Sequence, residues 1–200
     1  MSSRFEIIHP VIFEIPDDLH ELKGKEKVGF LGGAAREALA ESAKRSKAVL
    51  GELEKRENGA PIPCNGVHWS ISHKSEAVGG VVSPNPVGID IETIRPVTEA
   101  LYGRVAEETE WTLSSNDPLE TFFRFWTAKE AVLKALGIGF AGMGKCRVVD
   151  VPDDRHLILA FEGHNWQVEH FRTNSCLISV TLSKTLIQWH IEPYPGSLDA

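Results

Sequence analysis

Two carboxylates lie two positions apart in an apolar stretch at residues 87–92. In a strand, side chains alternate between two faces, so Asp90 and Glu92 would share one face while Ile89 and Ile91 occupy the other. Two neighbouring acids repel one another unless a cation lies between them. Mg²⁺ prefers carboxylates together with water and substrate phosphate. The pair therefore indicates either a divalent-metal site or a solvated strand edge.

A second set of polar side chains lies on a predicted helix that ends at Gly137. At 100° per residue, Thr127, Glu130 and Lys134 cluster opposite a broad apolar arc. Glu130 and Lys134 alone are typical of a surface i,i+4 ion pair, worth about 0.3 to 0.5 kcal/mol. Lys129 falls inside the apolar arc, where a lysine must reach solvent or find a partner. The helix thus presents a carboxylate and an ammonium in one direction, as an ion pair or as half of a site.

Capping signals set the bounds of this helix at Pro118 and Leu136. Asp117 suits the N-cap and proline suits the first helical position, whereas Gly137 suits a left-handed C-cap. The glycine-rich segment at 137–144 is predicted to be a loop.

Three strands are predicted upstream, at 66–73, 77–82 and 87–91, because short apolar runs alternate there with turn signals. We expect them to form one small sheet that brings His73 close to Asp90.

Another long helix is predicted at 29–57 from the spacing of its alanines and leucines, with Gly51 as a break or bend. This segment concentrates positive charge, usually a sign of a solvated helix face. Its basic residues include Arg36, Lys44, Arg45, Lys47, Lys55 and Arg56.

The remaining segments are predicted to be mainly strands. Phe5 to Ile15 suits a short edge strand, because Pro10 cannot donate to a central ladder. Further strands are predicted at 146–150, 156–162, 167–171, 176–182 and 186–192.

Each half of the chain thus has a long helix followed by strands, a faint repeat of architecture. It predicts an α+β fold of two similar lobes, 1–85 and 86–200, each a long helix packed on a small, mainly antiparallel sheet. We expect the active site between the lobes.

Composition excludes several classes of function. The chain has 28 acidic and 21 basic residues. The resulting net charge of −7 disfavours sequence-independent nucleic-acid binding. The cysteines at 64, 146 and 176 are too few and too far apart to indicate a disulfide framework or a metal-binding motif. The N-terminus lacks a leader pattern, and no apolar run approaches the length of a membrane span. We expect a cytoplasmic protein with no membrane partner.

Taken together, the motifs resemble those of the phosphopantetheinyl transferases. They are Val-Gly-Ile-Asp-Ile-Glu at 87–92 and Phe-Trp-Thr-Ala-Lys-Glu-Ala-Val-Leu-Lys at 125–134, at a separation that fits the family. Ile-Ser-His at 71–73 resembles an element of the larger, surfactin-synthetase-activating type, a single-chain pseudo-dimer of two α+β lobes. The match runs from about residue 58 to residue 139, less than half the chain.

The resemblance implies transfer of 4′-phosphopantetheine from coenzyme A to a serine of an apo acyl or peptidyl carrier protein, releasing 3′,5′-ADP. Asp90, Glu92 and Glu130 match the acids that hold Mg²⁺ against the pyrophosphate. Lys134 matches the lysine that contacts the phosphates and would stabilise the departing charge, and Glu130 is the candidate base for the carrier serine.

The same resemblance places Ser72 and His73 at the ribose 3′-phosphate of coenzyme A. Arg36, Lys44 and Arg45 are candidates for further nucleotide contacts. Because the repeat lies within one chain, we expect a monomer.

Two positions leave questions within this resemblance. The family's Gly-Lys-Pro turn, whose lysine helps to bind the 3′-phosphate, reads Gly59-Ala60-Pro61 here. Lys129 belongs to the second motif and has no assigned role.

Two other functions remain open from the sequence. A non-catalytic coenzyme A or nucleotide-binding module would retain the fold without turnover, as the missing lysine suggests. A metal-dependent hydrolase is disfavoured, because no nucleophile or water-activating histidine cluster is evident.

Overall fold

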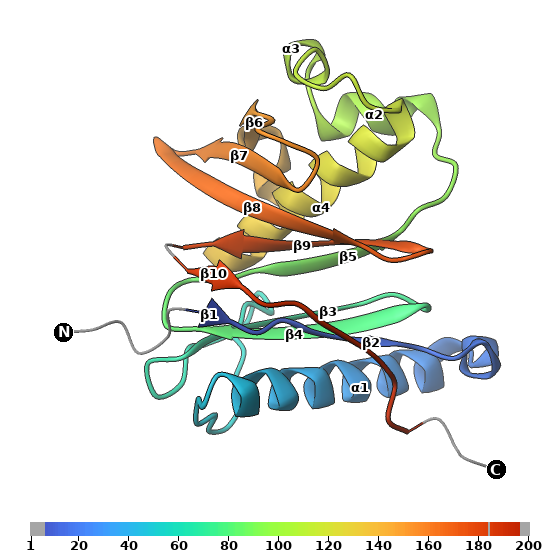
Figure 1. Ribbon diagram of the computed structural model, residues 1–200, viewed down its shortest axis with the longest axis vertical. Helices are drawn as coiled ribbons and strands as arrows, with labels where there is room; N and C mark the ends of the chain where they lie inside the picture. Colours follow the sequence, from blue (N-terminus) through green and yellow to red (C-terminus); the bar gives the residue numbers. More distant parts are fainter. Residues whose placement is uncertain (1–6, 184, 197–200) are drawn as a thin grey trace.

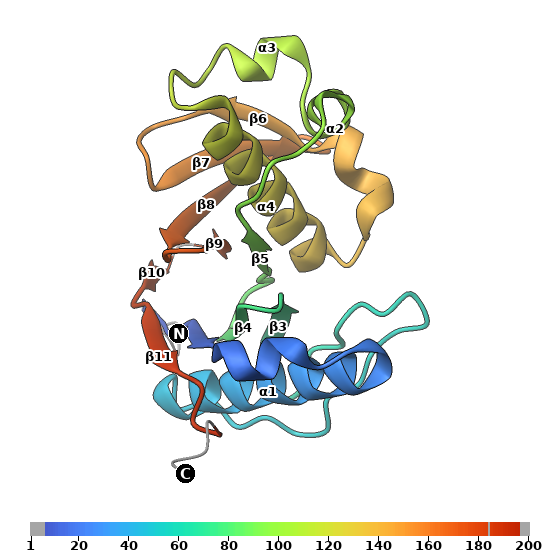
Figure 2. The same ribbon diagram turned by 90° about the vertical axis from the view of Figure 1, so that its right-hand side faces the viewer.

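Two long helices enclose the two larger sheets, which gives four layers in the order helix, sheet, sheet, helix (Figures 1 and 2), and β1 and β10 form a further two-stranded sheet. The structure is a computed structural model that describes residues 7–183 and 185–196. Along the chain the elements are β1 (Ile7–Ile8), β2 (Val11–Glu14), a 3₁₀ helix (Asp17–Glu21), α1 (Gly24–Arg45), β3 (His68–His73), β4 (Ala77–Ser83), β5 (Ile89–Thr93), α2 (Glu99–Val105), α3 (Glu108–Trp111), α4 (Pro118–Leu136), a second 3₁₀ helix (Phe140–Lys145), β6 (Arg147–Asp150), β7 (His156–Phe161), β8 (His164–Arg172), β9 (Cys176–Leu182), β10 (Leu186–Ile187) and β11 (His190–Pro193).

The first sheet has the strand order β11, β2, β4, β3, and α1 covers its outer face (Figure 2). On β4, Val78 and Val82 pack towards α1, whereas Ala77 and Val81 pack towards the second sheet. Gly80 lies directly beneath the helix, since a Cβ there would overlap the backbone of Leu39. Strand alternation therefore gives this sheet two buried faces.

The second sheet has the order β5, β9, β8, β7, β6, and all its neighbouring strands are antiparallel. Phenylalanines and aliphatic residues of α4 form the largest apolar cluster with its outer face. Its inner face contributes Ile89, Ile91 and Ile178 to the apolar layer between the sheets. The core is thus divided into three apolar layers.

The predicted bounds of α4 are confirmed. The Asp117 carboxylate accepts hydrogen bonds from the backbone nitrogens of Leu119 and Glu120 at 2.9 and 3.1 Å. Gly137 ends the helix in the left-handed conformation, with φ 68°. Local capping was sufficient to define this helix.

The predicted bounds of α1 are wrong, because the helix covers Gly24–Arg45 rather than 29–57. Lys47 adopts a left-handed conformation with φ 52°, and the Ala48 nitrogen donates to the Ala43 carbonyl at 2.8 Å. This pattern closes the helix without a glycine. Leucines beyond its end still pack against the core, so their spacing imitates a longer helix.

The single three-stranded sheet predicted around His73 and Asp90 is also wrong. β3 and β4 pair as expected, but β5 is an edge strand of the other sheet. Its backbone nitrogens at Ile89 and Ile91 donate to the hydroxyls of Ser70 and Ser72 on β3, at 3.1 and 3.2 Å. Serine side chains therefore satisfy the edge donors and connect the two sheets.

The N-terminal segment is not one short edge strand, because it forms the two strands β1 and β2. β2 lies inside the first sheet, because β11 pairs in parallel along its other side. Pro10 falls between β1 and β2, outside either ladder. Phe5 and Glu6, where the predicted strand began, lie outside the described residues.

The C-terminal strands occur in the predicted order, although β8 begins earlier than expected, at His164. The last predicted strand is divided into β10 and β11, which pair with β1 and β2.

The α+β fold class is confirmed. The division into lobes at 1–85 and 86–200 and their relation as a pseudo-dimer stay predictions, and β11 joins the sheet of the N-terminal half. Among the described helices, none has both the length and the apolar character needed to cross a membrane.

Candidate active site

A cavity of about 420 Å³ lies between β3, β5 and α4. The three acids predicted from the sequence line it: Asp90 and Glu92 from β5, and Glu130 from α4. Its other lining residues are Lys55, Ile71, Ser72, His73, Lys74, Trp126 and Lys134. The cavity therefore unites the two motifs with the Ser-His element.

Lys134 extends from α4 to β5 and is fully engaged there. Its ammonium donates to Asp90 Oδ1 at 2.7 Å, to the Ile89 carbonyl at 3.0 Å and to Ser72 Oγ at 3.0 Å. An ammonium has three donors, so none is left over. The ionic partner of Lys134 is thus Asp90, and the surface ion pair with Glu130 does not form.

Ser72 is buried and its hydroxyl is saturated. It donates to Asp90 Oδ1 at 3.2 Å and accepts from Lys134 Nζ and from the Ile91 nitrogen. A hydroxyl has one donor and two acceptor sites. In this geometry Ser72 positions Asp90 and Lys134 and has no hydrogen bond left for a ligand.

The two acids of β5 differ in their surroundings. Asp90 is 5% exposed, and its Oδ2 is buried without a hydrogen-bond partner. Glu92 accepts from Trp126 Nε1 at 3.0 Å and pairs with Lys74 Nζ at 2.9 Å. Because an unsatisfied buried carboxylate oxygen is costly, Asp90 Oδ2 is a position that a cation would stabilise.

Burial raises the pKa of Glu130, and the negative charges of Asp90 and Glu92 raise it further, against the opposing effect of Lys134. Burial also raises the pKa of Glu92, where the hydrogen bond from Lys74 opposes the shift. A divalent cation among these acids would lower both pKa values.

The pKa of His73 is lowered, first by desolvation and then by the positive charges of Lys134, Lys74 and Lys55. His73 is therefore neutral near pH 7 and can offer a hydrogen bond there, but not a positive charge.

The acids fit a magnesium ion by chemistry. Within the described residues, no group of three or more His, Cys, Asp or Glu side chains encloses a metal position by itself. Mg²⁺ does not need such an enclosure, because it keeps several waters and binds through one or two carboxylates plus substrate phosphate. Asp90, Glu92 and Glu130 provide hard oxygen donors of the required charge.

The basic candidates on α1 lie elsewhere. Arg36 donates to the Gly32 carbonyl of its own helix at 3.0 Å, and Lys44 pairs with Glu41 at 3.2 Å. Arg45 pairs with Glu41 at 2.9 Å and with a glutamate of β11 at 2.7 Å. None of the three is among the residues that line the acidic cavity.

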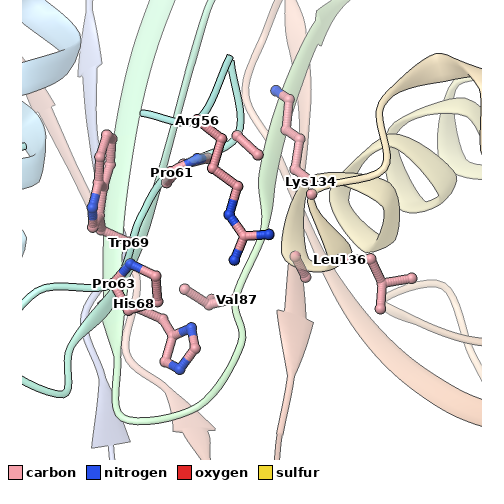
Figure 3. Close-up of a pocket in the computed structure, with 11 residues that line it drawn as sticks. Arg56, Pro61, Pro63, His68, Trp69, Val87, Lys134 and Leu136 are labelled. Atoms are coloured by element: carbon pink, nitrogen blue, oxygen red, sulfur yellow. The ribbon is translucent and has the colours of Figure 1, made fainter. Parts of the chain in front are cut away.

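Sequence reasoning missed three basic residues that border the site: Lys74, which pairs with Glu92, and two residues of the segment after α1. Lys55 lines the acidic cavity, and Arg56 lines a second cavity of about 100 Å³ that also contacts Lys134 (Figure 3). Both belong to a hairpin. In it, the Arg56 nitrogen donates to the Ala60 carbonyl at 2.8 Å, and Lys55 and Pro61 form an isolated antiparallel β-bridge. The Asn-Gly turn that follows them was the available signal, because it favours a hairpin over a continuing helix.

Lys129 has a structural partner. Its ammonium is buried and donates to Glu110 Oε1 at 2.6 Å and to the Val105 carbonyl at 2.7 Å. Glu110 also accepts from the Val148 nitrogen at 2.8 Å. The pair joins α2, α3 and β6 to α4, and the neighbouring Glu130 faces the cavity.

Fold and site together define an α+β protein with an acidic cavity suited to a divalent cation and a phosphate. A model of the 4′-phosphopantetheinyl transferase superfamily matches residues 86–194, more than half of the chain. The chain belongs to this superfamily, which confirms the resemblance seen in its motifs.

Several curated relatives are similar to parts of the chain. The 4′-phosphopantetheinyl transferase gsp of Aneurinibacillus migulanus is 36% identical over 91 residues, covering 44% of this chain and 38% of the relative. The 4′-phosphopantetheinyl transferase psf-1 of Bacillus pumilus is 35% identical over 95 residues, with 44% and 41% covered. The 4′-phosphopantetheinyl transferase HetI of a Nostoc species is 30% identical over 133 residues, with 63% and 53% covered. The alignments thus span about two fifths to one half of these relatives.

Proposed function

We propose that this protein transfers 4′-phosphopantetheine from coenzyme A to a serine hydroxyl of an apo acyl or peptidyl carrier protein. Mg²⁺ is the proposed cofactor and 3′,5′-ADP the second product. The observation that carries the proposal is the meeting of Asp90, Glu92 and Glu130 at one cavity, within a chain of this superfamily.

The acids would hold Mg²⁺ through Asp90 Oδ2 and the carboxylates of Glu92 and Glu130. When bound, the ion supplies positive charge against the pyrophosphate of coenzyme A. Positioning and charge neutralisation are the main requirements of phosphoryl transfer, so few covalent roles are left for the protein.

Glu130 is the proposed general base. It lines the cavity together with Asp90 and Glu92, and a carboxylate there can accept the proton of a hydroxyl brought within hydrogen-bond distance. The carrier serine oxygen forms a bond to the β-phosphorus, and its proton passes to Glu130. The bond from this phosphorus to the bridging oxygen breaks, and 3′,5′-ADP leaves with the electron pair.

Lys134 has two proposed functions in this reaction. In the present geometry it neutralises Asp90. To stabilise the leaving phosphate as well, it must exchange one of its three hydrogen bonds for a phosphate oxygen, because an ammonium has no further donor.

The contacts to the nucleotide are also part of the proposal. Ser72 and His73 are proposed at the 3′-phosphate, with Ser72 acting through the position of Lys134. Arg36, Lys44 and Arg45 stay predictions as nucleotide ligands. We further propose a monomeric, cytoplasmic protein.

A non-catalytic coenzyme A-binding module is the second candidate. The alanine at position 60 favours it, whereas the three acids and Lys134 favour the enzyme.

Intact mass of apo carrier proteins separates the two candidates. Several acyl and peptidyl carriers are incubated with the protein, coenzyme A and Mg²⁺, and coenzyme A binding is measured in parallel. The enzyme adds one phosphopantetheine to at least one carrier. Coenzyme A binding with no mass gain on any carrier would overturn the proposed reaction in favour of the module.

A further inference from the structure

Lys74 lies in the turn that joins β3 to β4, and it lines the acidic cavity. The Lys74 nitrogen donates to the Ala77 carbonyl at 2.8 Å, which closes the turn. In the same turn, the Glu76 carboxylate accepts from the Thr93 hydroxyl of β5 at 2.5 Å. The backbone of Lys74 is therefore held beside the end of β5, where Glu92 lies.

The side chain of Lys74 forms an ion pair with Glu92. Lys74 Nζ is 2.9 Å from Glu92 Oε2, and Trp126 Nε1 donates to Glu92 Oε1 at 3.0 Å. Both oxygens of this carboxylate thus have a partner. The Glu92 side chain is only 16% exposed, so solvent screens the pair less than it would on an open surface.

Two lysines pair with acids of the cavity, and they differ in how firmly they are held. The ammonium of Lys134 has three hydrogen bonds and is fully engaged. Within the part of the chain that the structure describes, the ammonium of Lys74 has one partner, Glu92, and the Lys74 side chain is 39% exposed. Two of its three donors are left for solvent or a ligand. Because a partly exposed ion pair contributes little, Lys74 can leave its carboxylate far more easily than Lys134 can.

A divalent cation and the Lys74 ammonium would compete for Glu92. Mg²⁺ takes oxygen ligands at about 2.0 to 2.1 Å and keeps waters on its other positions. With Lys74 still on Oε2, the ion and the ammonium would be like charges only a few ångströms apart, and they would repel one another. Lys134 holds only one oxygen of Asp90, so Asp90 Oδ2 is left for an ion. Glu92 is therefore the acid at which a bound metal meets a lysine that can move.

We propose that Lys74 is an internal counter-ion of Glu92 which a divalent cation must displace, so that Lys74 sets the affinity of the acidic cavity for metal. The inference rests on the proposed function, which supplies Mg²⁺ as the ion at Asp90, Glu92 and Glu130. Its consequence is that the cavity binds metal less tightly than its carboxylates alone would. The displaced ammonium stays beside the cavity, because the turn that carries it is fixed to β5.

Metal binding without coenzyme A or a carrier protein tests this role. Mn²⁺, which suits the same oxygen ligands as Mg²⁺, is titrated into each protein, the free ion is followed by electron paramagnetic resonance, and Mg²⁺ is measured by competition. Burial raises the pKa values of Glu92 and Glu130, so a pH of about 8 keeps both acids ionised. We expect K74Q to bind Mn²⁺ about three- to thirtyfold more tightly than the wild type, because one like charge is removed from a partly exposed site.

Further variants separate the charge of Lys74 from its shape. K74M, a second neutral variant, should show the same gain. K74R keeps the charge, so its Mn²⁺ affinity should stay within about twofold of the wild type. Lys25→Gln is the matched control, because Lys25 is an exposed lysine in the first turn of α1, away from the cavity, and K25Q should bind Mn²⁺ as the wild type does.

Unchanged or weaker Mn²⁺ binding in both neutral variants would overturn the inference. A gain in K74R equal to that in K74Q would also overturn it, because the effect would then not depend on the charge.

The metal readout also separates this inference from the proposed reaction. Tighter Mn²⁺ binding by K74Q, together with a wild-type protein that modifies no carrier, supports the inference and overturns only the transfer. A wild-type protein that modifies a carrier and binds metal no less tightly than K74Q overturns the inference alone. A wild-type protein that binds neither Mn²⁺ nor Mg²⁺ overturns the inference and the proposed cofactor together.

Discussion

Not every carboxylate of the acidic cavity forms an ion pair with a described protein residue. Asp90 forms an ion pair with Lys134, and Glu92 forms one with Lys74. Glu130 has no ion pair among the described residues, and burial together with two acidic neighbours raises its pKa. Glu130 is therefore the carboxylate of the cavity that is left without an ion-pair partner, and a cation bound there would stabilise it.

Magnesium should stabilise the protein more at high pH than at low pH. The pKa values of Glu92 and Glu130 are raised above the ordinary 4.5, so ionising them costs stability as pH rises from there through the folded values. Mg²⁺ binds the ionised carboxylates and competes with protons for them. We expect saturating Mg²⁺ to raise Tm more at about pH 8 than at about pH 5.

Thermal unfolding with and without Mg²⁺ checks this expectation, with E130Q as the comparison. The variant should show a smaller Mg²⁺ shift at the higher pH. Equal shifts at both pH values, or no shift at either, would contradict a metal site at these acids.

At the residue scale, alternation and helical periodicity were enough to select Asp90, Glu92 and Glu130. Ile89 and Ile91 enter the core between the sheets while the acids line the cavity, as alternation predicts. Hydrogen-bond saturation could not be predicted. It depends on β3, β5 and α4 meeting within 3.2 Å at Ser72, which no local pattern encodes.

At the element scale, the site depends on how closely α4 approaches β5. Gly88, just before β5, lies against the helix, because a Cβ there would overlap the carbonyl oxygen of Ala131. The same contact sets the positions of Glu130 and Lys134 relative to β5, since they lie one residue before and three residues after Ala131. A side chain at position 88 would therefore force helix and strand apart.

Gly88→Ala should cost about 1 to 3 kcal/mol of unfolding free energy or more, because the backbone must move to accept the methyl group. It should also reduce transfer, since Asp90 and Glu130 are separated. Denaturant unfolding measures the first effect and carrier modification the second.

Gly29→Ala is the control. That glycine lies in α1, and a Cβ added there would meet no atom within 4 Å, so the change should stabilise the protein by about 0.5 to 1 kcal/mol. A G88A protein as stable as the wild type would show that helix and strand are packed less tightly at this contact.

The two long helices show why some elements were predictable and others were not. The signals for α4 are local, since Asp117 and Gly137 directly adjoin it. The end of α1 uses the non-glycine Lys47 in a left-handed conformation, which sequence patterns do not mark. β5 joins the second sheet because it pairs with β9, whose residues lie more than eighty positions later in the chain.

At the scale of the whole molecule, a buried hydrogen-bond chain connects the second sheet to α4. His170 Nδ1 is 2.8 Å from Ser179 Oγ, which donates to Thr127 Oγ1 at 2.5 Å. Thr127 in turn donates to the Phe123 carbonyl at 2.8 Å. Because Ser179 uses its one proton towards Thr127, the hydrogen bond to Ser179 requires His170 to carry a proton on Nδ1.

This histidine should make the protein sensitive to acid. Burial, with the charges of Arg124 and His156, lowers the pKa of His170 from 6.5 to about 3. The unfolded chain therefore takes up a proton below pH 6.5 that the folded protein refuses until about pH 3, so stability is lost as pH falls through this window. Each pH unit there costs about 1.4 kcal/mol.

Urea unfolding at about pH 7 and about pH 5 tests this contribution, with H170Q as the comparison. The variant has no imidazole to protonate, so its stability should fall less between the two pH values. Glu92 and Glu130 titrate with the opposite sign, but they are present in both proteins, so the difference between variant and wild type isolates His170. An identical loss of stability between the two pH values in both proteins would exclude His170 as the cause.

The overall architecture was predictable as α+β, with a long helix and strands in each half. The crossing of β10 and β11 to β1 and β2 was not, because parallel pairing between the two ends of a chain leaves no local trace. The same crossing makes β2 an inner strand, contrary to its proline-rich sequence surroundings.

The central claim is that the acids of β5 and α4 perform carrier modification, and Glu130→Gln tests it most directly. Intact mass of an accepted apo carrier is followed over time with wild type, E130Q and E26Q, the last a change of an exposed acid on α1. We predict that E26Q modifies the carrier at the wild-type rate and that E130Q, with an unchanged fold, is slower by about 10² to 10⁴, the usual contribution of a general base. Wild-type rates in E130Q would contradict the account.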